Sequence, residues 1–64
     1  MNNPKLRERL FTEGIKTFGG LDEFEKWLDT QARELNYKKP KDLLDTEANT
    51  QRVIDLLSKI REQS

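Results

Sequence analysis

Two short segments, Phe24-Glu25-Lys26-Trp27-Leu28 and Pro40-Lys41-Asp42-Leu43-Leu44-Asp45-Thr46, decide the fold of this chain. Phe24, Trp27 and Leu28 fall at positions i, i+3 and i+4, so they share one face of a helix. A tryptophan buries roughly 150–250 Å², a large part of what so short a chain can hide. We therefore predict that Trp27, the only tryptophan, lies at the centre of the core beside the two leucines of the second segment. The alternative is an exposed tryptophan that anchors a partner.

Helical periodicity recurs along the whole chain, while alternating strand patterns are nearly missing. The spacing predicts helices near residues 5–18, 21–35 and 47–62, with a short helical turn at 41–44. The predicted class is all-α: a small bundle of three main helices plus a short helical turn. We expect residues 1–64 to form a single domain, with frayed ends at 1–4 and 62–64.

The first predicted helix carries an amphipathic stripe and ends at a pair of glycines. Gly14 inside this helix costs about 1 kcal/mol relative to alanine, so either another helix packs closely there or the helix bends. Gly19-Gly20 favours a helix end, because glycine readily takes the left-handed conformation of a C-cap. The stripe consists of Leu6, Leu10, Phe11, Ile15 and Phe18.

The boundaries of the other helices are predicted from capping residues. The second helix is expected to start near Leu21 or Asp22, and Asp22 with Glu25 fits a capping box. Asn36 is a candidate C-cap for it. Pro40 suits the first position of a short helix, and Thr46 suits the N-cap of the last one.

Composition limits the possible functions. The chain has 12 basic and 12 acidic residues, no cysteine and no histidine, which excludes disulfides, Cys/His zinc sites and Cys or His nucleophiles. An enzyme would have to work through Asp, Glu, Lys or Tyr in a domain small for a typical pocket of roughly 300–1,000 Å³. We therefore expect no enzyme, metal or cofactor. No apolar run suits a membrane span or signal peptide, so we expect a cytoplasmic protein.

A basic patch next to an aromatic residue is the first candidate for binding a partner: Tyr37, Lys38, Lys39 and Lys41. It could contact nucleic acid or an acidic protein surface, or it could be a solvated loop. Because the net charge is zero, the chain lacks the basic excess of a typical DNA-binding domain.

From Phe18 onward the chain resembles the antitoxin Xre/MbcA/ParS-like toxin-binding domain of bacterial type II toxin–antitoxin systems. Order and spacing agree with that family's Trp-Leu pair, its Pro-x-x-Leu-Leu-x-Thr turn and its final helix. The resemblance covers about two-thirds of the chain. The matching residues are Phe18-Gly19, Asp22-Glu23, Trp27-Leu28, Leu35, Pro40, Leu43-Leu44-Asp45-Thr46, Val53, Leu57 and Ile60.

Four features depart from the family pattern. A helix break with Pro or Asn usually follows the Trp-Leu pair, where this chain has the better helix former Thr30–Glu34. Tyr37-Lys38-Lys39 and Ala48-Asn49 replace glycines that are common before the proline and before the last helix. Many members also carry an N-terminal helix-turn-helix domain, for which 64 residues leave no room. A short stand-alone form and a domain of a longer antitoxin both remain open.

The resemblance implies an antitoxin that binds a cognate toxin, often of the NAD-consuming RES class, and occludes its active site. Members commonly self-associate, so a homodimer is possible, and the last helix and tail often supply the contacts. On this chain that implies Val53–Ser64. The exposed candidates are Arg52, directly before this range, and Ile54, Arg61 and Glu62 within it. Ile54 lies at the edge of the apolar face made by Val53, Leu56, Leu57 and Ile60. We expect no direct DNA binding by this chain alone.

Overall fold

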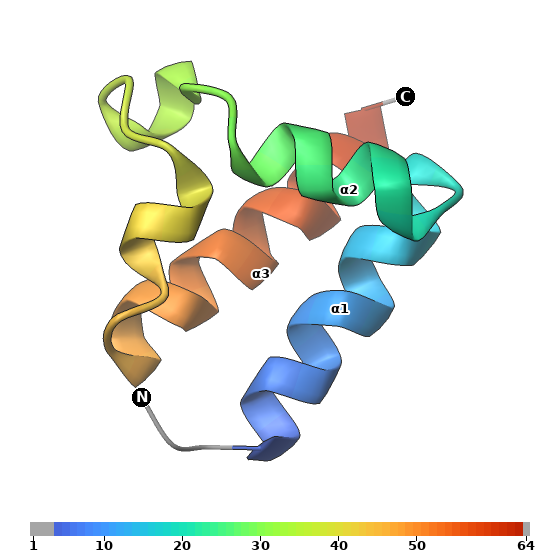
Figure 1. Ribbon diagram of the computed structural model, residues 1–64, viewed down its shortest axis with the longest axis horizontal. Coiled ribbons are helices and arrows are strands. Elements are labelled where there is room, and N and C mark those ends of the chain that lie inside the picture. Colours follow the sequence, from blue (N-terminus) through green and yellow to red (C-terminus); the bar gives the residue numbers. More distant parts are fainter. Residues whose placement is uncertain (1–3, 64) are drawn as a thin grey trace.

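The computed structural model describes residues 4–63. Within that part the chain forms three α-helices and two short 3-10 turns: α1 (Pro4–Phe18), α2 (Leu21–Leu28), η1 (Arg33–Leu35), η2 (Pro40–Leu43) and α3 (Glu47–Gln63) (Figure 1). The all-α prediction is confirmed, including the helical turn that Pro40 starts. Of the ends that we expected to fray, residues 1–3 and 64 lie outside the described residues, while Pro4, Glu62 and Gln63 are helical.

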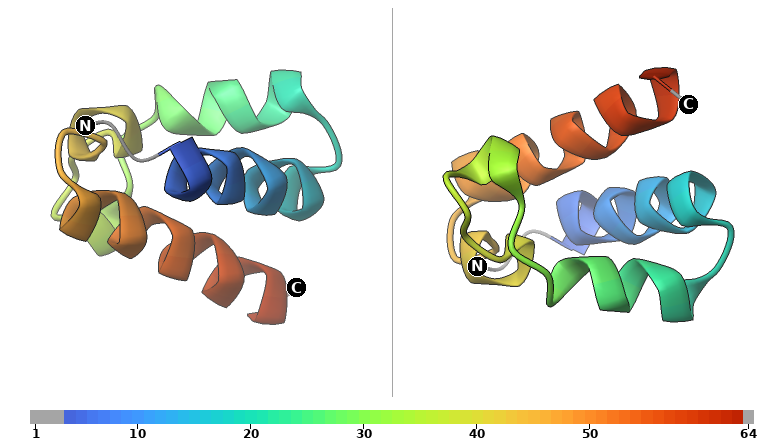
Figure 2. Two further views of the ribbon diagram at one scale, coloured as in Figure 1. Left: turned by 90° about the horizontal axis from the view of Figure 1, so that it is seen from below. Right: turned by 90° about the horizontal axis from the view of Figure 1, so that it is seen from above.

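Helix α1 is the middle layer of the bundle, with α2 on one side and α3 on the other (Figure 2). The segment from residue 29 to residue 46 lies at one end of the bundle. The Gly19-Gly20 turn and the C-terminal end of α3 lie at the opposite end. The two ends of α3 therefore have different neighbours.

Phe24, and not Trp27, occupies the centre of the core. Its side chain is 0% exposed, and its ring meets Phe11 edge-on at 5.5 Å between centroids. Phe18 and Trp27 stack on Phe24 at 6.3 and 6.2 Å. Trp27 itself is only half-buried, packed on Phe18 at the margin of this cluster. The prediction of a central Trp27 was wrong, because α2 directs Phe24 at α1 and leaves Trp27 to one side.

Of the two alternatives at Gly14, a bend or the close approach of another helix, the structure shows the close approach. A Cβ built on Gly14 would overlap the Cδ1, Cε1 and Cζ atoms of the Phe24 ring. Glycine is needed here because α2 lays an aromatic ring directly on the α1 backbone. Gly19 ends α1 in the left-handed conformation, with φ of +78°, and its N–H donates to the Ile15 carbonyl at 2.7 Å.

The predicted helix over 21–35 is wrong, because α2 ends at Leu28. The N–H of Asp29 and the Thr30 hydroxyl both donate to the Lys26 carbonyl, at 3.2 and 2.8 Å. These bonds satisfy the Lys26 carbonyl at the end of α2, and they take the place of the hydrogen bond that would continue the helix. The break that the family places after its Trp-Leu pair is therefore present, although the sequence there favours a helix.

A compact loop follows α2. Ala32 is extended and buried, and its N–H donates to the Lys38 carbonyl at 3.0 Å in an isolated antiparallel bridge. Asn36 and Tyr37 take left-handed conformations, with φ of 57° and 64°. Asn36 thus has the predicted cap conformation, but it ends η1 rather than α2.

The remaining boundaries are partly as predicted. Thr46 caps α3, because the N–H of Asn49 donates to its hydroxyl oxygen at 3.0 Å. Asp22 is not an N-cap: α2 starts after Gly20 without a side-chain cap, and Asp22 lies in its first turn. Ile15, expected in the amphipathic stripe of the first helix, is exposed, and so is Leu21 at the start of α2.

Candidate partner-binding surface

The solvent side of α3 presents a row of charged side chains. Arg52, Asp55, Lys59 and Glu62 are exposed, and their spacings of three, four and three residues place them on one helix face. We call these four residues the α3 stripe. Three apolar residues of α3 belong instead to the core cluster: Val53, Ile54 and Leu57.

A shallow hollow of about 290 Å³ runs beside the stripe. Two leucines, the half-buried Leu35 of η1 and the buried Leu56 of α3, contribute its apolar part. Its charged lining comes from Glu34 and from three members of the stripe: Arg52, Asp55 and Lys59. The hollow thus places an apolar floor beside charges of both signs, which can select a partner by charge complementarity.

Of the four candidates on the last helix, Arg52 and Glu62 are exposed as expected, and both lie in the α3 stripe. Ile54 does not, because it is 3% exposed and belongs to the core cluster. The prediction of an exposed Ile54 was wrong. Both α1 and the segment that contains η2 pack against α3, so the buried face of α3 is wide enough to include Ile54.

Arg61 is half-buried and has a structural contact. Its Nη2 lies 2.7 Å from Oε1 of Glu13, which ties the last turn of α3 to α1.

Asp55 and Lys59 are the members of the stripe that the sequence interpretation missed. Their signal was present, since a 3–4 spacing of charges opposite the apolar residues marks an exposed helix face.

The basic patch has a different environment. Tyr37 is 62% exposed and Lys38 is also exposed, but the other two lysines gather around one carboxylate. The Nζ atoms of Lys39 and Lys41 lie 3.4 and 2.7 Å from Oδ1 of Asp29. These ion pairs reduce the positive charge that the patch offers to an anionic partner.

The ion pairs predict a pH effect at the end of α2. The hydrogen bond from Lys41, with the charge of Lys39, holds the pKa of the Asp29 carboxyl below its usual value, and Asp29 raises the pKa of Lys41. Because the carboxyl pKa is lowered, its small stabilising effect is present above the pKa of the unfolded chain and is lost as pH falls through the folded value. Carboxyl ¹³C shifts should show Lys41→Gln raising the pKa of Asp29 more than Lys39→Gln. Equal effects of the two substitutions would contradict the geometry.

The described residues contain no group of side chains typical of a metal-dependent active site. Among residues 4–63 no group of His, Cys, Asp or Glu is arranged to hold a metal ion. None of the helices in this range is long and apolar enough to cross a membrane.

The chain is similar to a known protein family. Residues 14–62 match the family model of the antitoxin Xre/MbcA/ParS C-terminal toxin-binding domain. The match runs from the close-packed Gly14 to the last residue of the α3 stripe. No curated protein and no solved structure shows significant similarity to the chain.

Proposed function

The chain belongs to the antitoxin Xre/MbcA/ParS C-terminal toxin-binding domain family, and from this premise we propose that it neutralises a cognate cytoplasmic toxin through α3. In this proposal the α3 stripe and the last turn of the helix contact the toxin and occlude its active site. The family match over residues 14–62 is the observation that carries the proposal. The exposed charges of α3 give it a surface.

The shape of α3 suits this role. It has 17 residues, which corresponds to about 25 Å of helix at 1.5 Å per residue. Its core face holds it against α1, and the Arg61–Glu13 ion pair fixes its last turn. A rigid helix loses little conformational entropy on binding, which favours affinity. Mixed charges along the stripe favour one partner over others.

We assign the toxin to the RES class, as the family resemblance implies. Such an enzyme consumes NAD, so its active site must hold the two negative charges of a pyrophosphate. A site of that kind presents positive charge, and Glu62 at the end of the stripe complements it. The toxin reaction also supplies the assay, because NAD consumption can be followed directly.

The test is a titration of toxin activity with variants of the domain. Arg52→Ala is expected to weaken inhibition about tenfold, because arginine is often a dominant residue of protein interfaces. Arg9→Ala is the matched control, since Arg9 is an exposed arginine on α1. Removal of residues 62–64 should also weaken inhibition while leaving thermal unfolding unchanged. A cut after Ile60 is less suitable, because it removes the Arg61–Glu13 ion pair.

Equal inhibition by the wild type, Arg52→Ala and the truncated chain would contradict binding through α3. In that case substitutions in the Tyr37–Lys41 patch would be the next to examine. Loss of inhibition by Arg9→Ala as well would indicate a nonspecific effect of charge.

Self-association and nucleic-acid binding are separate questions for the same protein. We propose a homodimer, as the resemblance implies, which sedimentation would detect as a mass that rises with concentration.

The nucleic-acid alternative requires binding by the isolated chain that weakens steeply with salt. The pairing of Lys39 and Lys41 with Asp29 favours toxin binding over that alternative.

A further inference from the structure

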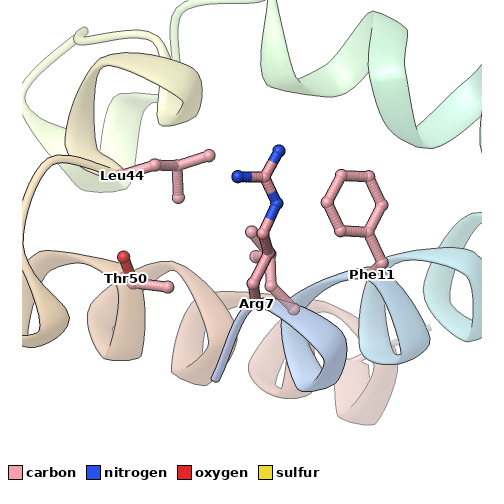
Figure 3. Close-up of a pocket in the computed structure, with 5 residues that line it drawn as sticks. Arg7, Phe11, Leu44 and Thr50 are labelled. Carbon is pink, nitrogen blue, oxygen red and sulfur yellow. The ribbon is translucent and has the colours of Figure 1, made fainter. Parts of the chain in front are cut away.

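A second concave site lies at the other end of the bundle from the last turn of α3. It is a pocket of about 330 Å³ between the first half of α1, the residue that follows η2 and the first turn of α3. Figure 3 shows Arg7 extending between Leu44 and Phe11, with Thr50 below Leu44. The lining residues are Arg7, Leu10, Phe11, Leu44 and Thr50.

Arg7 gives this apolar pocket a positive charge. Its guanidinium carbon lies 6.0 Å from the centroid of the Phe11 ring, within the range of a cation–π contact. Within residues 4–63 no carboxylate forms an ion pair with it. A guanidinium stays charged at any ordinary pH and offers planar, paired N–H donors that fit a carboxylate. Arg7 can therefore pair with an anion beside the apolar walls of the pocket.

Thr50 adds a hydrogen-bond acceptor on the wall. The residue is 1% exposed, and its hydroxyl donates to the Thr46 carbonyl at 2.7 Å. The proton of this hydroxyl is thus committed, but its oxygen retains lone pairs that can accept a bond from a ligand N–H. A ligand with a carboxylate, an apolar group and an amide would use all three features.

We propose that this pocket binds an apolar carboxylate. The carboxylate pairs with Arg7, and a branched or aromatic group packs against Leu10, Phe11 and Leu44. The volume is at the lower end of the roughly 300–1,000 Å³ typical of ligand pockets, which suits one amino-acid-sized group. Such a group can come from a free organic acid or from the C-terminal residue of a polypeptide, and only the second brings an amide N–H to Thr50.

This site is separate from the proposed toxin-blocking surface. Arg52, the member of the stripe nearest to Thr50, is exposed while Thr50 is buried, and two residues place them about 200° apart around the helix axis. None of the pocket residues belongs to the α3 stripe. The pocket can therefore be occupied while α3 contacts a toxin, and its test does not need the toxin.

The test is a titration of the ¹⁵N-labelled full chain followed by NMR. Three probes are compared: 3-phenylpropionate, N-acetylphenylalanine and N-acetylphenylalanine amide. We expect both acids to shift the amide signals around Arg7, Phe11, Leu44 and Thr50, and the amide to bind at least about tenfold more weakly because it lacks the charge. Tighter binding of N-acetylphenylalanine than of 3-phenylpropionate would identify a chain terminus as the source, and equal binding a free acid.

Variants decide whether Arg7 carries the interaction. Arg7→Gln should lower the affinity for both acids about tenfold, and Arg7→Lys should restore part of it because the charge remains. Arg9→Gln makes the same charge change on the same helix outside the pocket, so it should bind the acids as the wild type does. Arg7 is exposed, and unchanged thermal unfolding of Arg7→Gln would verify that the fold is intact. Equal binding of acid and amide, equal losses in the Arg7 and Arg9 variants, or shifts spread over the whole surface would overturn the proposal.

Discussion

Phe24→Ala is expected to unfold most of the domain. Its ring is fully buried among three other aromatic rings, and removing a buried phenylalanine side chain costs about 3–5 kcal/mol. A domain of this size has a total free energy of unfolding of only a few kcal/mol. Circular dichroism should therefore show a large loss of helix at 25 °C, with a broad or absent thermal transition.

Trp27→Ala is the matched control for that prediction. Trp27 belongs to the same helix and the same aromatic cluster, but its side chain is only half-buried. Its removal leaves less empty volume in the core, so the loss of stability should be clearly smaller than for Phe24→Ala. A larger loss for Trp27→Ala would restore the sequence-based view that the tryptophan is the centre of the core.

Gly14→Ala should also be strongly destabilising. The new methyl group would overlap the Phe24 ring, and that ring is held in place by Phe11, Phe18 and Trp27. Overpacking of this kind costs about 1–3 kcal/mol and sometimes more. Alanine recovers about 1 kcal/mol through its higher helix propensity. Because α2 must move away from α1, we expect a net loss of about 2 kcal/mol in denaturant unfolding.

A double-mutant cycle and a control glycine test the cause. Phe24→Leu should destabilise the Gly14→Ala variant less than it destabilises the wild type, because the smaller side chain relieves the overlap. Gly20→Ala should be nearly neutral: a Cβ there meets no atom within 4 Å, and its φ of 173° is extended. Additive effects of Gly14→Ala and Phe24→Leu would show that the two residues do not clash.

Only part of the candidate surface could be predicted from the sequence. The exposure of Arg52 and Glu62 could be predicted from the last helix, and the same periodicity would have added Asp55 and Lys59. Ile54 could not be placed, because its burial depends on how much of α3 the segment containing η2 covers. The Arg7 pocket had no sequence signal at all, since its lining residues come from three separate segments.

The sequence alone determined the all-α class, the ends of α1 and α3, the turn at Pro40 and the family. These features depend on local causes: apolar periodicity, glycine and proline conformations, and a threonine cap that bonds its own helix. The tertiary structure decided where α2 ends, which aromatic ring is central and whether Ile54 is buried. Residues 30–35 favour a helix locally, but the buried Ala32 and its bridge to Lys38 require an extended chain there. Such choices depend on packing between distant segments, and the free energy of that packing exceeds the small local preference for a helix.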